Sequence, residues 1–168
     1  MNSILYLDID GILNSVQDMH NKSWIQAVDY TNWKPECVQL IDRLCLLTDC
    51  KIVISSSWRI VIYKTIEEWN EAFRQAGAIH IKVIGITPRS SNGFRGREIN
   101  MWMAENNFIG PYVILDDDTD FFPNQFRVWV DSYLGLQYEH IEKAIKILEG
   151  QSLGLNLRCM EERNPPND

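Results

Sequence analysis

Short apolar runs that end in polar residues are the feature that most constrains the fold of this chain. They cover residues 4–7, 51–54 and 112–115, and a further strand is expected at 79–86. Apolar runs of this length without polar alternation are typical of strands that are buried on both faces, as in a parallel sheet. Because segments with helical spacing separate the runs, the order of elements predicts right-handed β-α-β units in an α/β domain.

The segments between the strands carry helix signals. Pro35 suits the first position of a helix, where its missing N–H costs nothing. Apolar residues from Ile66 to Ala76 lie on one face of a second helix, which Gly77 ends. Further helices are expected around 99–103 and 138–148, and a short fifth strand at 126–130.

The domain organisation follows from the absence of a long linker. We expect one catalytic domain over residues 1–150, with a short flap or insert at 14–35. A C-terminal tail is expected at 151–168, with a frayed end.

Composition narrows the functional classes. The chain has 168 residues and a net charge of −7, opposite to the charge expected of a general duplex nucleic-acid binder. No apolar run approaches the roughly 20 residues of a membrane span. The four cysteines form no C-x-x-C pair and no basic cleavable leader is present, which favours reduced thiols in a cytoplasmic protein over a zinc site. The sequence gives no indication of oligomeric state.

Polar side chains follow each expected strand. Asp8 and Asp10 follow the first strand and the stretch S-S-S-W-R (55–59) follows the second. A loop that leads to Arg95 and Arg97 follows the third, and D-D-D-T-D (116–120) follows the fourth. In such sheets ligands bind at the carboxyl ends of the strands, so we expect these groups to converge at one edge.

This mixture of groups indicates a chemistry. Several carboxylates at one edge repel one another unless a cation lies between them. Oxygen ligands without nearby His or Cys favour Mg²⁺ over zinc. Magnesium beside hydroxyls and arginines is typical of phosphate handling, and an aspartate can attack phosphorus directly. The sequence therefore predicts Mg²⁺-dependent chemistry on a phosphorylated substrate.

Four motifs give these groups a family resemblance. D-I-D-G-I-L-N (8–14) resembles the first motif of the haloacid dehalogenase (HAD) superfamily, and I-S-S-S-W-R (54–59) resembles the second. R-G-R-E-I (95–99) resembles the third motif, and V-I-L-D-D-D-T-D-F (113–121) resembles the acidic fourth. Within the superfamily, the chain is most similar to the HAD domain of Swiss Army knife RNA repair proteins. The resemblance implies a three-layer Rossmann-like sheet with helices on both faces, capless or with a short flap.

The resemblance also implies roles for the acidic residues. Asp8 would be the nucleophile and a metal ligand. Asp10 would be the general acid and base, with its backbone carbonyl on the metal. Asp116, Asp117 and Asp120 would supply the remaining metal ligands. The alternative for these positions is a polar strand end and a solvated acidic loop.

Roles for the hydroxyls and cations follow in the same way, with alternatives. Ser55 would bind the phosphate, and Ser56 is the substitute. Arg95 matches the third-motif cation best, and Arg97 is its rival. Arg59 either reaches the substrate or pairs with an acid.

The expected function is a phosphomonoester hydrolase that works through an aspartyl-phosphate on Asp8. A site without a large cap admits a nucleotide or a nucleic-acid terminal phosphate. Trp24, Tyr30 and Trp33 either stack bases or pin the flap to the sheet. Alternatives are a phosphoprotein phosphatase, a catalytically silent phosphate- or nucleotide-binding module, and phosphotransfer to an acceptor other than water.

Overall fold

A parallel sheet forms the centre of the protein. The computed structural model describes residues 3–15 and 30–163, with residues 155–163 as backbone only. The strands are β1 (Ile4–Leu7), β2 (Lys51–Ile54), β3 (Val83–Ile86), β4 (Tyr112–Asp116) and β5 (Arg127–Trp129). They form a five-stranded sheet in the order β3-β2-β1-β4-β5, and every pairing is parallel. The sheet confirms the α/β class that the apolar runs predicted.

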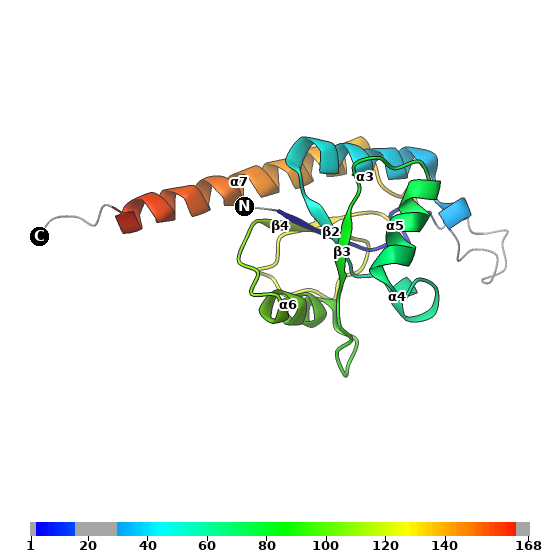
Figure 1. The fold of residues 1–168 in the computed structure, drawn as a ribbon, viewed down its shortest axis with the longest axis horizontal. Helices are drawn as coiled ribbons and strands as arrows, with labels where there is room; N and C mark the ends of the chain where they lie inside the picture. The colour runs from blue at the N-terminus through cyan, green and yellow to red at the C-terminus, as the bar shows by residue number, and fades with distance from the viewer. Residues whose placement is uncertain (1–2, 16–29, 164–168) are drawn as a thin grey trace, which may run out of the picture.

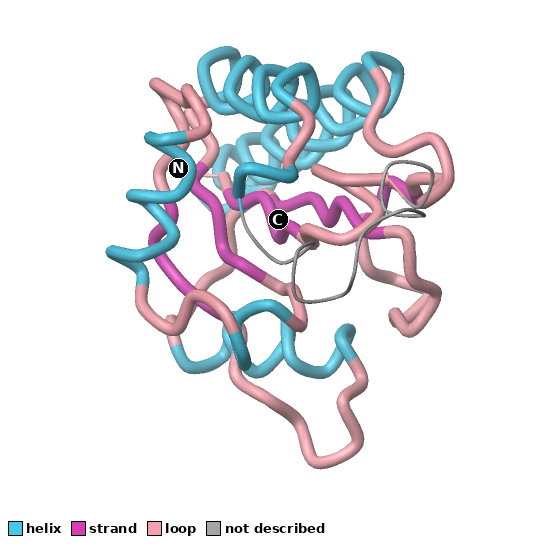
Figure 2. Tube along the Cα trace, turned by 90° about the vertical axis from the view of Figure 1, so that its right-hand side faces the viewer, coloured by secondary structure: helices cyan, strands magenta, loops and turns pink. Residues whose placement is uncertain are grey.

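Helices cover both faces of this sheet. Helices α3 (Pro35–Thr48), α5 (Ile66–Gln75) and α7 (Tyr138–Arg163) pack on one face, and α6 (Arg95–Glu105) packs on the other (Figure 1). The view turned by 90° shows the strands between these two helical layers (Figure 2). Two short helices, η1 (Tyr30–Asn32) and α4 (Trp58–Val61), complete the described elements. This three-layer arrangement is the expected Rossmann-like, HAD-like fold.

The central strands are apolar throughout because both of their faces are buried. Leu5 and Leu7 of β1 belong to the large core under α3, α5 and α7. Ile4 and Tyr6 belong to the smaller core under α6, where the Tyr6 ring packs edge-on against Trp102. The continuous apolar pattern, without polar alternation, follows from this two-sided burial.

Four segments differ from the expectations. Strand β3 begins at Val83, not at 79, because the Asp42 carboxylate accepts the N–H groups of residues 79, 80 and 81. Strand β5 is shorter than 126–130, and α7 continues through Gly150 to Arg163 where a tail was expected. Helix α4 was not predicted.

Several other expectations stay predictions. The middle of the flap, with Trp24, and the chain end after 163 lie outside the described residues, and the domain boundaries remain a prediction.

The rings of Tyr30 and Trp33 pack against each other, and Trp33 also contacts Trp69. These contacts agree with the alternative in which the aromatic residues pin the flap to the rest of the domain. Cys37, Cys45 and Cys50 are buried. Among the described helices, none is long and apolar enough to cross a membrane.

Candidate active site

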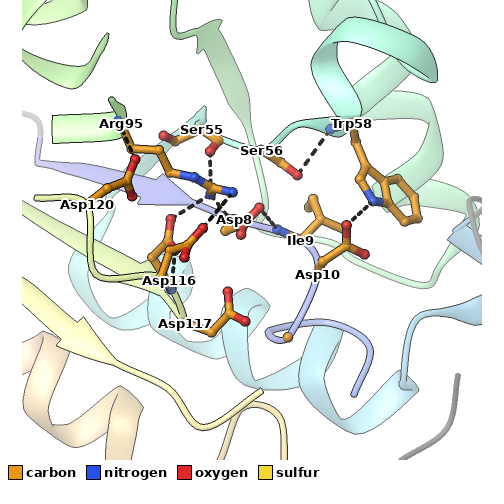
Figure 3. Close-up of polar contacts among 12 residues, drawn as sticks. Asp8, Ile9, Asp10, Ser55, Ser56, Trp58, Arg95, Asp116, Asp117 and Asp120 are labelled. Atoms are coloured by element: carbon orange, nitrogen blue, oxygen red, sulfur yellow. Dashed lines mark hydrogen bonds and ion pairs between the residues drawn. The ribbon is translucent and has the colours of Figure 1, made fainter. Parts of the chain in front are cut away.

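The sheet register brings together the residues at the carboxyl ends of β1, β2 and β4. Strand β1 lies between β2 and β4, with Leu7 opposite both Ile54 and Leu115. The Asp8 N–H donates to the Leu115 carbonyl at 3.1 Å, which continues the ladder into the site. The Ser55 N–H donates likewise to the Leu7 carbonyl at 2.9 Å. Three adjacent strand ends therefore hold Asp8, Ser55 and Asp116 side by side (Figure 3).

Three of the predicted metal ligands form one cluster. Asp8, Asp116 and Asp117 each place a carboxylate oxygen within 4.8 Å of the others. Asp8 is 2% exposed and Asp116 is 0% exposed, so little water screens the two carboxylates. An all-oxygen set of this spacing fits a hard cation such as Mg²⁺. The name acidic cluster is used below for these three residues.

Gly11 allows the turn after Asp8 to pass close to this cluster. Its φ is +72°, in the left-handed region that favours glycine. A Cβ at this position would lie 2.5 Å from Oδ2 of Asp117, closer than atoms normally approach. The glycine in D-I-D-G is therefore required by both the backbone conformation and the neighbouring carboxylate.

Arg95 is the cation that faces the acidic cluster. Its Nη1 lies 2.8 Å from Oδ2 of Asp8 and 2.7 Å from Oδ2 of Asp116. The same nitrogen donates to the Ser55 carbonyl at 2.9 Å. Arg97 is exposed, and no described contact links it to the cluster. The structure thus places Arg95 at the site and Arg97 outside it.

The charges in the cluster exceed what one arginine offsets. Burial raises the pKa of Asp8 to about 6 and that of Asp116 to about 8, even though Arg95 lowers both. Burial also raises the pKa of Asp117. Burial disfavours the charged form of Arg95, but Asp8 and Asp116 outweigh it and raise the pKa of that guanidinium. A divalent cation would offset the remaining negative charge, so these residues fit Mg²⁺.

Asp10 is held at the side of the cluster by two neutral donors. The Trp58 indole N–H donates to Oδ2 of Asp10 at 2.8 Å. The Asn14 amide donates to Oδ1 at 3.0 Å, and its own oxygen accepts the Gly11 N–H. Figure 3 shows the Asp10 carboxyl and the Trp58 indole pointing toward each other.

These two donors were missed by the sequence analysis. Asn14 and Trp58 both lie inside quoted motifs, which was the available signal. Trp58 is 48 residues from Asp10 in the chain, and no spacing rule links them.

Both predicted serines lie at the site with different partners. The Ser56 hydroxyl hydrogen-bonds the Asp8 carboxylate and accepts the backbone N–H of Trp58 at 3.3 Å. The Ser55 hydroxyl is buried and has no hydrogen-bond partner among the described residues. An orphaned buried hydroxyl is costly unless something binds it, which agrees with the expected role of Ser55 toward phosphate.

Arg59 pairs with an acid, which is one of its two expected alternatives. Its side chain is 7% exposed and lies 2.5 Å from the Glu98 carboxylate. It also donates to the carbonyls of Ser56 and Thr87. Glu98 in turn accepts the Ser90 N–H at 2.9 Å. This buried pair joins the ends of β2 and β3 to α6.

Asp120 lies outside the acidic cluster. Its Oδ2 accepts the backbone N–H of Arg95 at 2.9 Å, so Asp120 caps the first turn of α6. Its Oδ1 is buried and has no partner in the described part of the chain. The structure therefore groups three of the four carboxylates that were predicted to bind the metal. Asp120 lies beside them, as does Asp10, whose backbone carbonyl was the predicted ligand.

A cavity of about 240 Å³ opens beside Arg95. Its lining carries cations and acids together: Ser57, Arg59, Ile60, Arg89, Gly93, Arg95, Glu98, Asp118 and Asp120. This opening offers space for a small anionic group next to the acidic cluster.

Comparison with known proteins gives one match. A family model described as the HAD domain in Swiss Army Knife RNA repair proteins matches residues 4–141. That range contains every residue of the site described above. No curated protein and no solved structure matches the chain.

Proposed function

Because the chain belongs to the family of HAD domains in Swiss Army Knife RNA repair proteins, we propose that it is a Mg²⁺-dependent phosphomonoester hydrolase that forms an aspartyl-phosphate on Asp8. Membership implies the phosphatase-type hydrolase superfamily. The observation that carries the finer proposal is the position of Asp8, which is buried, paired with Arg95 and part of the acidic cluster.

The first step transfers the phosphoryl group to the protein. A carboxylate oxygen of Asp8 attacks phosphorus, and the bond to the leaving oxygen breaks. Asp10 gives its proton to that oxygen, so the leaving group departs as a neutral alcohol. The Arg95 guanidinium stabilises the charge on the phosphoryl oxygens. Mg²⁺, held by Asp8, Asp116 and Asp117, would shield their carboxylates from the incoming phosphate.

The second step releases phosphate. The Asp10 carboxylate takes a proton from water, and the water oxygen attacks phosphorus. The bond between phosphorus and Asp8 breaks, which restores the Asp8 carboxylate and the protonated Asp10. Trp58 and Asn14 hold the orientation of the Asp10 carboxyl through both transfers.

We propose a nucleotide or a nucleic-acid terminal phosphate as the substrate. The description of the family, which names RNA repair, supports this class. The presence of both Asp8 and Asp10 favours turnover over a silent binding module, which needs neither proton transfer nor a nucleophile.

An activity screen tests the proposal. Purified protein is assayed with Mg²⁺ or EDTA on p-nitrophenyl phosphate, nucleoside monophosphates, end-phosphorylated oligonucleotides and phosphopeptides. We expect Mg²⁺-dependent release of phosphate that Asp8→Asn abolishes. Asp49→Asn, at an exposed position outside the site, is the matched control and should keep full activity. Wild-type protein that is inert on the whole panel, or that binds phosphate esters without turnover, would overturn the proposal.

A further inference from the structure

A cationic groove lies along the exposed edge of the sheet, next to the acidic cluster. It has a volume of about 500 Å³ and is named the edge groove here. Strand β5 and helix α7 line it with Arg127, Val128, Trp129, Lys143, Lys146 and Ile147.

The charge of the edge groove is opposite to that of the chain. Its lining holds three cations and no carboxylate, although the chain has 23 acidic and 16 basic residues. Lys143 and Lys146 are exposed, and no ion pair joins either to a carboxylate within the described residues. Arg127 lies 5.1 Å from the centre of the Phe121 ring and donates to the Asp118 carbonyl. Three positive groups are therefore available to an anionic partner.

Trp129 connects this groove to the active site. Its side chain is 52% exposed, and its indole N–H donates to the Asp117 carbonyl at 2.8 Å. Trp129 also lies opposite Asp116 in the register of β4 and β5. Because β5 is parallel to β4, the groove runs from Trp129 at the site end past Arg127, away from the acidic cluster.

We propose that the edge groove binds the single-stranded nucleic acid that carries the terminal phosphate, which rests on the function proposed above. The cations contact backbone phosphates, and the exposed Trp129 indole stacks on a base. Cations interleaved with an exposed aromatic ring are the usual means of binding single strands without sequence preference. An acidic peptide would use the cations but not the exposed ring, so the nucleic-acid strand fits the groove better.

Hydrolysis by substrate length tests the proposal. We expect kcat/KM for an end-phosphorylated single strand of six nucleotides to exceed that for the mononucleotide. Lys143→Gln with Lys146→Gln should lower kcat/KM for the oligonucleotide and leave mononucleotide hydrolysis unchanged. Lys64→Gln with Lys82→Gln is the matched control, since both lysines are exposed and lie away from the groove, Lys82 just before the opposite edge strand.

Binding gives a readout that does not need turnover. Fluorescence anisotropy measures the affinity of Asp8→Asn protein for a labelled six-nucleotide strand. Three phosphate contacts predict a slope of log affinity against log salt of roughly −2, which the Lys143 and Lys146 double variant reduces to about −0.7. Trp129→Leu should weaken binding by roughly 5- to 150-fold relative to Trp129→Phe, because both lose the indole N–H and only Phe keeps a stacking ring.

Each outcome separates the groove from the active site. Equal kcat/KM for mononucleotide and oligonucleotide, with no effect of the lysine variant on binding, overturns the groove and leaves the phosphatase proposal intact. Lysine-dependent preference for phosphopeptides over oligonucleotides also overturns it, in favour of an acidic-peptide groove. Salt-dependent binding of the strand by a protein without any phosphatase activity supports the groove and refutes the proposed function.

Discussion

The hydrogen bond from Trp58 to Asp10 leads to the most specific prediction. Trp58→Phe removes the indole N–H that Asp10 accepts and keeps a ring in a position that is 2% exposed. A hydrogen bond to a charged group contributes about 1.5–3 kcal/mol. If that energy serves to orient Asp10 in the transition state, its loss lowers the rate by roughly 10- to 160-fold.

The assay compares two leaving groups. The p-nitrophenolate ion leaves with little help from an acid, whereas an alkoxide needs the proton from Asp10. We therefore expect Trp58→Phe to lower kcat/KM for an alkyl phosphate, such as a nucleoside 5′-monophosphate, by that factor. For p-nitrophenyl phosphate, kcat/KM should change only slightly. This parameter reports the first transfer alone, and in that step p-nitrophenolate needs little help from the acid.

Trp69→Phe is the matched control. The Trp69 ring is also buried and also packs against Trp33, but its indole N–H has no partner among the described residues. It should leave both kcat/KM values close to those of the wild type. Equal losses on the two substrates in Trp58→Phe, or the same loss in Trp69→Phe, would refute the positioning role.

Three further predictions concern the glycine turn, the buried ion pair and the metal. Gly11→Ala should cost about 1–2 kcal/mol of stability from backbone strain, and it should also lower activity because the new Cβ displaces Asp117. Gly77→Ala is the control: its φ is +92° but no atom lies near, so it should cost stability alone. Equal activity losses in the two variants would contradict a role of Gly11 in placing Asp117. Arg59→Met leaves the Glu98 charge buried and unpaired, so urea denaturation should show a loss of about 3–5 kcal/mol; a loss near zero would exclude a structural role. Burial raises the pKa of Asp8 to about 6 and that of Asp116 to about 8. Without metal, the folded protein therefore binds more protons than the unfolded chain between about pH 4 and pH 8. Its stability falls as pH rises through this range. Mg²⁺ should therefore raise Tm more at pH 8 than at pH 5.5 in a thermal melt, and a pH-independent shift would argue against metal binding by these residues.

The strands could be predicted because the physics that forms them is local. The apolar runs at 4–7, 51–54 and 112–115 are strands in the structure because helices bury both faces of the sheet. The start of β3 was wrong because Asp42, far away in the chain, binds the N–H groups of residues 79–81. That interaction depends on how α3 packs, which no local pattern records.

The site could be predicted to the level of sheet edges. The rule for parallel sheets brought Asp8, Ser55 and Asp116 together correctly, because adjacent strands end in register. The choice between Arg95 and Arg97 could not be made in this way. Residues two apart in a helix point in nearly opposite directions, so only one of them faces the site, and the orientation of α6 decides which.

Trapping the covalent phosphate tests the central claim most directly. Asp10→Asn protein should still accept phosphate from p-nitrophenyl phosphate and should hydrolyse the resulting aspartyl-phosphate slowly, because it lacks the base for the second step. After an acid quench and proteolysis, mass spectrometry should find one added phosphoryl group on the peptide that contains Asp8. The same experiment with Asp8→Asn added should show none. The account would be contradicted if the wild-type protein turns over substrate but the Asp10→Asn variant carries no phosphate on Asp8. Phosphate on Ser55 in that variant, in place of Asp8, would contradict it as well.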